Sequence, residues 1–204
     1  MMESALISGD AVMRPIEQIV AECQRGERAA FDLLFERYHS RVYAVAFGIL
    51  RHEAEAEDAV QDAFVKVYRN IGTFEGDSSF ETWLIAITVN CCRDRLRRQK
   101  VRQALSLEAL TPRALLRALG VSNDPARTMA RRERRRNLWE AVGELDMRHR
   151  VTLVLRYQEG LSCGEIADIL GLSLSTIYTR LSEGRQQLRE LLDGEDARRL
   201  ESGE

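Results

Sequence analysis

Acidic side chains are concentrated between residues 53 and 64, which read EAEAEDAVQDAF. Residues 51–62 carry five acids and one arginine, so this stretch has a net charge of −4. On a helix, Glu55, Asp58 and Asp62 would lie within about 60° of one another. The opposite face is apolar and is predicted to be buried; its residues are Ala56, Val60, Ala63, Phe64, Val67 and Ile71.

Three kinds of chemistry fit this acidic face: metal binding or catalysis by carboxylates, plain solvation, or docking on a basic protein surface. Carboxylates on one convex helix face do not converge on an ion, and no glycine-rich phosphate loop accompanies them. The chain has three histidines, and its cysteines lack C-x-x-C spacing. We therefore predict no metal and no cofactor, and structural roles for Cys23, Cys91, Cys92 and Cys163.

The most specific pattern lies in residues 160–188, GLSCGEIADILGLSLSTIYTRLSEGRQQL. Ser162 and Glu165 form a capping box that begins one helix, and Gly171 suits the left-handed turn that ends it. Ser173 can cap the helix that follows. Three packing positions have the spacing of a helix-turn-helix, whose second helix enters the DNA major groove: Ala167, Gly171 and Ile177. The alternative is an ordinary helical hairpin with solvated polar residues.

The exposed face of that second helix is rich in hydroxyls and arginines, which bond phosphates and base edges. Its residues are Ser175, Thr176, Tyr178, Thr179, Arg180, Ser182, Glu183 and Arg185. Upstream, residues 131–136 read RRERRR, with a net charge of +4. This short run is either a solvated helix start at the end of a linker or a phosphate contact.

Residues 78–102, SSFETWLIAITVNCCRDRLRRQKVR, predict a helix that is apolar on two sides and therefore buried on two sides. A narrow polar stripe remains to be presented: Thr82, Ala86, Asn90, Arg93 and Arg97. The end of this helix, residues 93–102, carries a net charge of +5, which is an electrostatic footprint for a phosphate backbone. The preceding loop, residues 70–80, either holds an unstacked base or packs its phenylalanines into the core.

The helical periodicity and the absence of long alternating runs predict an all-α protein of 204 residues with net charge −2. We expect two small helical domains, joined by a flexible linker. No signal peptide or membrane span is evident, so we expect a cytoplasmic protein. The predicted organisation is a flexible N-terminal tail at 1–13, a first domain at 14–102, the linker at 103–131, a second domain at 132–193 and a flexible acidic tail at 194–204.

Together, these stretches resemble a bacterial sigma factor of the extracytoplasmic-function (ECF) group of the sigma-70 family. The family's A-E-D-x-x-Q-x-x-F helix matches Ala56-Glu57-Asp58, Gln61 and Phe64. Its T-W-L-x-x-I-x-x-N-x-x-x-D helix matches Thr82-Trp83-Leu84, Ile87, Asn90 and Asp94. The C-terminal block LRYQEGLSCGEIADILGLSLSTIYTRLSEGRQQL also matches, so the resemblance covers most of the chain.

The resemblance implies a role for each stretch, in a protein that catalyses nothing itself. The acidic helix would dock on the β′ clamp helices of core RNA polymerase through Glu55, Glu57, Asp58, Gln61 and Asp62. The first domain would melt and read the promoter −10 element through Thr73, Phe74, Asp77, Ser78, Trp83, Asn90, Arg93 and Arg97. The second would read the −35 element, near the β flap, through Ser173, Ser175, Thr176, Tyr178, Thr179, Arg180, Ser182, Glu183 and Arg185.

The resemblance also implies that the linker threads through the polymerase and that a dedicated anti-sigma factor covers these surfaces. Two departures stand out in the second helix. Tyr178 and Glu183 occupy positions where relatives often have Arg or Lys, and Gly184 lies inside the helix at a cost of about 1 kcal/mol. A third departure is Asp146, where relatives often have Pro. The competing hypotheses are a stand-alone DNA-binding regulator and a carboxylate-dependent nucleic-acid enzyme.

Overall fold

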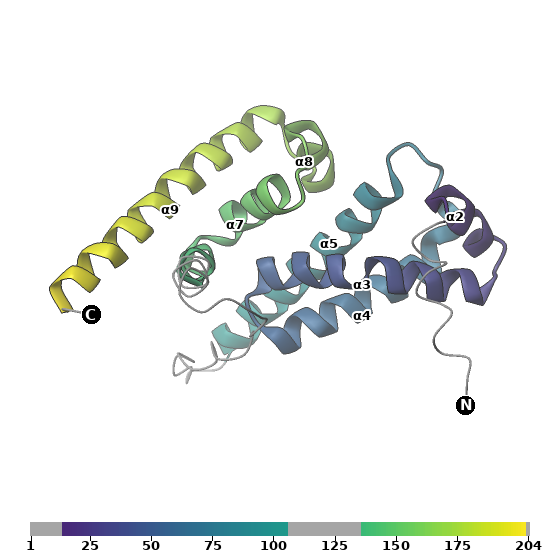
Figure 1. Ribbon diagram of the computed structural model, residues 1–204, viewed down its shortest axis with the longest axis horizontal. Coiled ribbons are helices and arrows are strands. Elements are labelled where there is room, and N and C mark those ends of the chain that lie inside the picture. The colour runs from purple at the N-terminus through teal and green to yellow at the C-terminus, as the bar shows by residue number, and fades with distance from the viewer. Residues whose placement is uncertain (1–13, 106–135, 203–204) are drawn as a thin grey trace, which may run out of the picture.

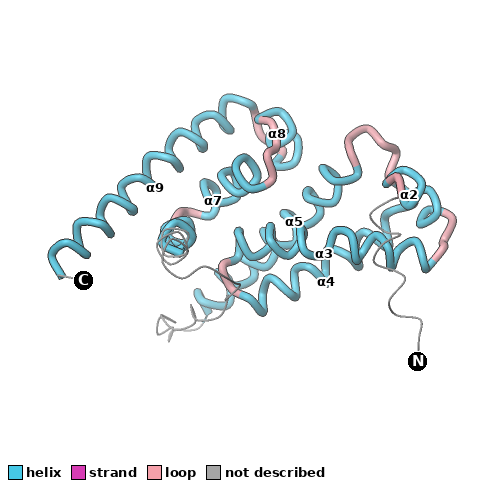
Figure 2. The backbone as a smooth tube through the Cα atoms, viewed as in Figure 1, coloured by secondary structure: helices cyan, strands magenta, loops and turns pink. Residues whose placement is uncertain are grey.

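The computed structural model describes residues 14–105 and 136–202, with only the backbone described for 100–105 and 194–202. Every regular element in these ranges is a helix, which confirms the predicted all-α fold class (Figure 2). The rest of the chain, which includes most of the predicted linker and most of the RRERRR run, lies outside the described residues. The described helices form two groups, one from each half of the chain (Figure 1).

The N-terminal group is built on three helices that all pack against one another: α3 (Arg28–Leu50), α4 (Glu53–Asn70) and α5 (Phe80–Leu105). The short helix α2 (Ile16–Gln24) packs on α3, and the 3-10 turn η1 (Ile71–Thr73) follows α4. The apolar face predicted for α4 is buried in the centre of this group, from Ala56 to Ile71. The helical-wheel interpretation of residues 53–71 is therefore confirmed.

Helix α5 packs against both α3 and α4 and is buried on two sides, as its sequence predicts. Its most enclosed apolar residues are Phe80, Leu84, Ile85, Val89, Cys91 and Cys92. The buried hydroxyl of Thr88 donates to the carbonyl oxygen of Leu84 at 2.9 Å, so this polar group is satisfied within the helix. Burial on two sides fixes the rotation of α5 and therefore which residues it presents.

The first turn of α4 explains part of the acidic run. The ring of His52 accepts a hydrogen bond from the backbone N–H of Glu55 at 3.4 Å and so caps the helix. Glu53 and Glu55 lie in this first turn, where carboxylates are stabilised by the positive end of the helix dipole. Some of the acids therefore favour the helix start itself, whatever surface they also form.

The C-terminal group begins with helical residues 136–144. It continues with α7 (Met147–Leu153), the π-helical turn η2 (Val154–Gln158), α8 (Cys163–Leu170) and α9 (Leu174–Ser202). Helix α9 extends beyond residue 193, which was the predicted end of the second domain. Helix α5 similarly extends to Leu105, beyond the expected boundary at residue 102.

The helix-turn-helix predicted for residues 160–188 is confirmed. The capping box at the start of α8 is complete, because Ser162 and Glu165 each bond the other's backbone N–H. Gly171 ends α8 with a φ of 64°, and Ser173 accepts from the N–H of Thr176 at 3.3 Å at the start of α9. Ile177 is fully buried in the angle between the two helices.

Gly184 allows α9 to pack closely against α7. A Cβ at this position would lie 3.1 Å from the Cβ of His149 and 3.2 Å from Cδ1 of Leu153. Since a glycine inside a helix costs about 1 kcal/mol relative to alanine, the close approach is the physical reason for keeping it. The departure noted at Gly184 is therefore a packing requirement of this domain.

The two groups are in contact with each other, which the sequence did not predict. Helix α3 packs against α7 and η2, and α5 packs against α8. The buried apolar residues of both groups form one continuous cluster. Within the described residues, no helix is both long and apolar enough to cross a lipid bilayer.

The cysteines provide a direct test of this packing. Burial raises the pKa of Cys23 to about 11 and that of Cys92 to about 12, and it also raises the pKa of Cys91. Only the thiolate attacks a disulfide reagent, so these three buried thiols should resist modification near pH 8. We expect the native protein to titrate one thiol rapidly with a chromogenic disulfide, the partly exposed Cys163, and all four after denaturation. Rapid reaction of two or more native thiols would contradict the described core.

Candidate functional site

The acidic face of α4 is partly neutralised by a single arginine from α5. The guanidinium of Arg95 bonds Glu55 at 3.1 Å, Asp58 at 3.0 Å and Asp62 at 2.7 Å. Burial alone would lower the pKa of Arg95, but its hydrogen bonds to Asp62 and Glu55 outweigh burial and raise it. One guanidinium against three carboxylates leaves the cluster with two net negative charges, held in a fixed arrangement.

The role of Arg95 was not evident from the sequence. There, Arg95 is one of the basic residues of the run 93–102, and the whole run was predicted to contact a phosphate backbone. The structure instead commits Arg95 to carboxylates on α4, and Lys66 similarly approaches Asp94 at 3.7 Å. Arg95 lies on the side of α5 that faces α4, whereas Arg97 is exposed. Helical spacing separates these two arginines, but only the packed position of α5 shows which one meets α4.

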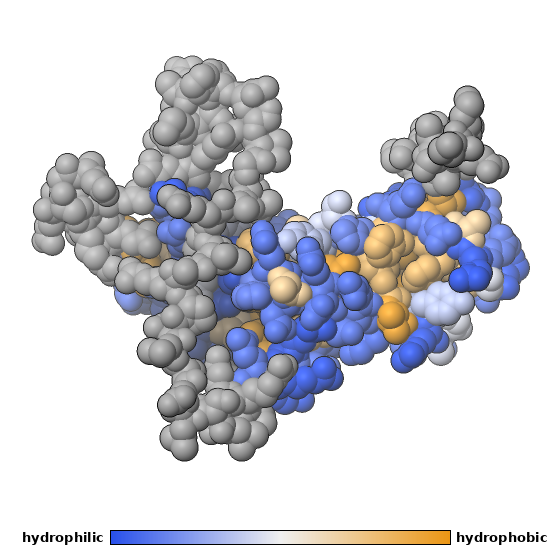
Figure 3. Space-filling view, turned by 90° about the horizontal axis from the view of Figure 1, so that it is seen from below, coloured by the Kyte–Doolittle hydropathy of each residue, from blue (hydrophilic) through white to orange (hydrophobic). Residues whose placement is uncertain are grey.

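Glu57 and Gln61, the other two residues predicted to dock on polymerase, lie on a different part of the α4 surface. They line a shallow hollow together with Phe35, His39, Tyr43 and Val60. Exposed apolar side chains continue this surface, because Phe35, Val65 and Tyr68 are between 39% and 58% exposed. Figure 3 shows apolar surface surrounded by polar residues on the underside of the molecule. The docking residues thus fall into an arginine-bound carboxylate cluster and a mixed apolar and polar hollow.

The loop before α5 is anchored by an aromatic cluster. The ring of Phe74 packs edge-on against Phe80 at 5.7 Å and lies 5.2 Å from Trp83, measured between ring centroids. The side chain of Gln24 donates to the carbonyl oxygen of Phe74 at 2.9 Å, and Thr73 donates to that of Asn70 at 2.8 Å. Of the two alternatives for this loop, the packing of its phenylalanines into the core is therefore observed, with Phe80 buried and Phe74 partly buried.

The remaining residues predicted to contact the −10 element are at the surface. Asp77 and Ser78 are exposed at the tip of the loop, and Asn90 and Arg97 are exposed on α5. Arg93 is partly buried and close enough to Arg180 of α9 to help lower the pKa of Arg180, although burial is the largest cause of that shift. The polar stripe of α5 therefore lies near the helix-turn-helix both at Thr82, which donates to Glu165 of α8, and at Arg93.

Most of the face predicted to read the −35 element is exposed on α9, including Ser175, Tyr178, Thr179 and Ser182. Glu183 has an internal partner, because its carboxylate meets Nε2 of the buried His149 at 3.1 Å. Nδ1 of the same ring meets the side-chain oxygen of Gln187 at 2.9 Å. An acid at position 183 is thus explained by a contact with α7.

The other polar residues of this face lie at the start of α9 or along it. Ser173 caps the helix and shares hydrogen bonds with the hydroxyls of Ser175 and Thr176. The guanidinium of Arg185 reaches the hydroxyl of Tyr157 at 3.4 Å. Among the residues that the structure describes, no group of His, Cys, Asp or Glu side chains is arranged to hold a metal ion.

Comparisons with known proteins agree with this architecture. The family model for sigma-70 region 2 matches residues 34–102, and the model for sigma-70 region 4 matches residues 135–188. The ECF RNA polymerase sigma factor SigW of Bacillus subtilis is 30% identical over 182 residues, which cover 87% of this chain and 96% of SigW. The RNA polymerase sigma-H factor of Pseudomonas aeruginosa is 31% identical over 86% of this chain and 93% of its own length.

Two solved structures are similar across most of the chain. CnrH, solved in complex with the cytosolic domain of CnrY, has a TM-score of 0.61 at 28% identity, covering 86% of this chain and 96% of CnrH. The sigma factor RpoE of Bartonella quintana, solved with the anti-sigma factor NepR, has a TM-score of 0.59 at 23% identity, covering 80% of this chain and 96% of RpoE. The fold, the helix-turn-helix and the relatives define a DNA-binding protein of transcription initiation. The chain belongs to the ECF sigma factors of the sigma-70 family.

The contact between Arg95 and the acidic face generates a stability prediction. Replacing Arg95 with Gln leaves three carboxylates facing one another, which should lower the free energy of unfolding by about 1–2 kcal/mol, since exposure of the acids weakens the effect. Urea denaturation at pH 7 measures this change. Arg97→Gln is the control, because Arg97 is exposed and its ion pair with Asp94 is long at 3.9 Å. Equal stability of the two variants would show that Arg95 does not hold α4.

Proposed function

We propose that this alternative sigma factor binds core RNA polymerase through α4 and brings it to promoters by melting the −10 element and reading the −35 element. One observation carries the proposal: both sigma-70 regions match, in chain order, on the two helical groups that hold the predicted surfaces. The protein supplies sequence specificity, and the polymerase supplies catalysis. Its place of action is the cytoplasm, with the polymerase.

The polymerase-binding surface consists of Glu55, Glu57, Asp58, Gln61 and Asp62. The Arg95 cluster offers ordered carboxylate oxygens with an excess of negative charge, which suits the basic residues of the β′ clamp helices. The hollow beside Glu57 and Gln61 adds apolar contact area, which interfaces bury at their centres. Charge then guides association, and the apolar part adds affinity.

The −10 surface consists of the loop before α5 and the polar stripe of α5. Asp77 and Ser78 at the loop tip are placed to bond the edges of an unstacked base, and the partly buried rings of Phe74 and Trp83 lie close by for stacking. The basic end of α5 holds the strand; the residues assigned to this surface are Thr73, Phe74, Asp77, Ser78, Trp83, Asn90, Arg93 and Arg97.

The −35 surface is the exposed face of α9, which enters the major groove as the second helix of the helix-turn-helix. Its assigned residues are Ser173, Ser175, Thr176, Tyr178, Thr179, Arg180, Ser182, Glu183 and Arg185. Because Glu183 is held by His149 and Ser173 caps the helix, base contacts fall mainly to the exposed residues between Ser175 and Ser182. The β flap and a dedicated anti-sigma factor complete the proposed set of partners.

A reconstituted run-off assay tests the function directly. Bacterial core polymerase and genomic promoter DNA are incubated with and without the protein, and the transcript starts are sequenced. New specific transcripts are expected, and their upstream sequences would define the −10 and −35 elements. If no transcripts appear and the protein does not bind core polymerase, the acidic face needs a different partner and a stand-alone DNA-binding regulator becomes the better explanation.

The docking surface makes a separate prediction. Replacing Glu57 with Lys should weaken binding to core polymerase by about tenfold or more, because like charges across an interface cost several kcal/mol. Glu57 is preferable to Glu55 or Asp58 because it is not bonded to Arg95, so its reversal leaves the internal cluster intact. Glu17→Lys, at an exposed position of α2, is the control. Fluorescence anisotropy with labelled protein measures both, and equal affinities would exclude this face from the contact.

A further inference from the structure

Helix α7 holds the second helix of the helix-turn-helix through one buried histidine. The side chain of His149, on α7, is only 1% exposed. Its Nε2 lies 3.1 Å from Oε2 of Glu183, and its Nδ1 lies 2.9 Å from Oε1 of Gln187, both on α9. Because a carboxylate can only accept hydrogen bonds, Nε2 carries the hydrogen that joins the ring to Glu183. Both nitrogens of this buried ring are therefore used to bind α9.

The two partners of His149 lie one helical turn apart. Glu183 and Gln187 are at positions i and i+4 of α9, which share one face of a helix. Gly184 makes room for the histidine between them, since a Cβ at 184 would lie 3.1 Å from the Cβ of His149. Helices α7 and α9 pack against each other (Figure 1), and α9 can neither rotate nor slide on α7 without losing these contacts.

Glu183 lies at the border of the surface that we propose for the −35 element. It follows Thr179 by four residues and Arg180 by three, so these side chains are neighbours on one side of α9. Its own side chain is still 53% exposed. It is also the only acid among the residues assigned to that surface. A carboxylate thus stands beside a surface proposed to meet phosphates, which are anions.

The same carboxylate would oppose DNA binding if it were free. It would repel the phosphate backbone, or it would pair with Arg180 one turn earlier and remove that cation from the DNA surface. The bond to His149 instead keeps Oε2 of Glu183 turned toward α7. Both harmful outcomes depend on the negative charge, so removing the charge removes them.

We propose that His149 is a positioning residue for −35 reading, which fixes the rotation of α9 on α7 and holds the carboxylate of Glu183 away from promoter phosphates. The consequence for DNA rests on the proposed function, whereas the contact between the two side chains does not. His149 is too deeply buried to touch DNA itself. Its effect on promoter binding passes through Glu183.

Three single variants and one double variant separate charge from packing. His149→Phe keeps a ring against Gly184 and removes both hydrogen bonds to α9. Glu183→Gln keeps the shape of the side chain and removes its charge, and the double variant combines the two changes. Thr152→Val is the matched control, because Thr152 is a buried polar residue of α7 whose hydroxyl bonds within that helix, to the carbonyl oxygen of Arg148 at 2.7 Å.

Nuclear magnetic resonance of the full chain tests the contact without polymerase. The chain has three histidines, and we expect one slowly exchanging ring N–H, which disappears in His149→Phe. Glu183→Gln should shift this resonance, because it replaces a charge-assisted hydrogen bond with a neutral one. Glu190→Gln, at an exposed position further along α9, should not shift it. A ring N–H that exchanges rapidly, or one that ignores Glu183→Gln, would overturn the proposal.

Promoter binding tests the consequence. Core polymerase carrying each variant is titrated onto a duplex promoter fragment from the run-off assay. His149→Phe should weaken binding by about three- to tenfold at about 50 mM KCl, and less at about 300 mM, where exposed charges are screened. In the Glu183→Gln background the same replacement should change the affinity by less than about twofold. Thr152→Val should bind like wild type, and circular dichroism confirms that each variant keeps its helices.

The comparison of the two backgrounds decides the proposal. Equal losses from His149→Phe with and without the charge of Glu183, at every salt concentration, would show that the histidine acts by packing alone. A His149→Phe complex that binds as tightly as wild type would also overturn the proposal. If the wild-type complex binds no promoter, the proposed function fails and the consequence for DNA fails with it, while the resonance spectra decide the contact by themselves.

Discussion

The burial of α5 on two sides is the constraint on which the rest of this structure depends. Because α5 packs against both α3 and α4, only narrow strips of its surface are free to contact other elements or solvent. One edge brings Arg95 onto the carboxylates of α4, and another brings Thr82 to α8. Its first turn also carries the rings that anchor the preceding loop. A single helix thereby connects the three surfaces that we propose for polymerase, for the −10 strand and for the −35 duplex.

Several charged side chains on the proposed binding surfaces already have partners within the protein. From the sequence, Arg95 was predicted to contact phosphates, yet it neutralises part of the negative charge on the acidic face of α4. Glu183 lies on the second helix of the helix-turn-helix, yet it bonds a buried histidine. A net charge of −2 therefore hides specific internal ion pairs such as those of Arg95 and Arg41.

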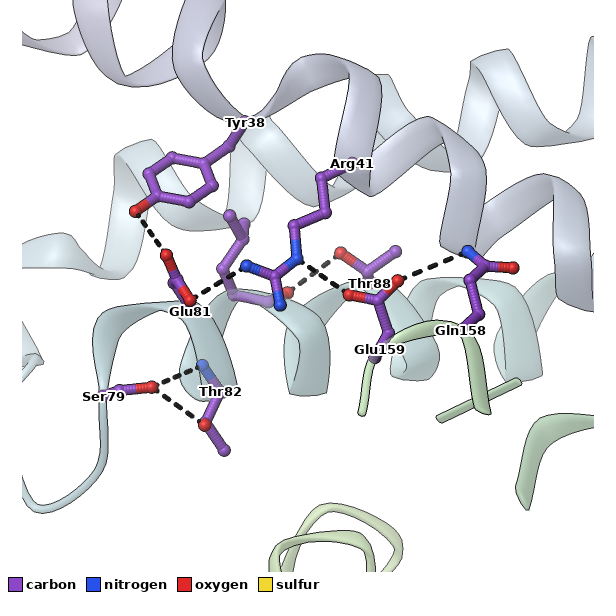
Figure 4. Close-up of polar contacts among 9 residues, drawn as sticks. Tyr38, Arg41, Ser79, Glu81, Thr82, Thr88, Gln158 and Glu159 are labelled. Carbon is purple, nitrogen blue, oxygen red and sulfur yellow. Dashed lines mark hydrogen bonds and ion pairs between the residues drawn. The ribbon is translucent and has the colours of Figure 1, made fainter. Parts of the chain in front are cut away.

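The contact between the helical groups buries charged side chains as well as apolar ones. In this contact Glu159 is buried against Arg41 (Figure 4), and Thr82 at the start of the α5 stripe donates to Glu165. Interfaces between domains of one chain are commonly polar and permit relative motion, and a connecting segment keeps the partners at high effective concentration. A buried ion pair suits such a contact because its stability depends on both partners being present.

The sequence by itself determined the helices, their buried faces and the helix-turn-helix, because periodicity, the Ser162–Glu165 box and Gly171 act over a few residues. It also carried the sigma-70 motifs in order, and hence the family. Only the tertiary structure decided which arginine meets the acids of α4, why Gly184 is needed and that Glu159 meets Arg41. These outcomes join residues 33 to 118 positions apart, whose meeting depends on how whole helices pack rather than on spacing along one of them.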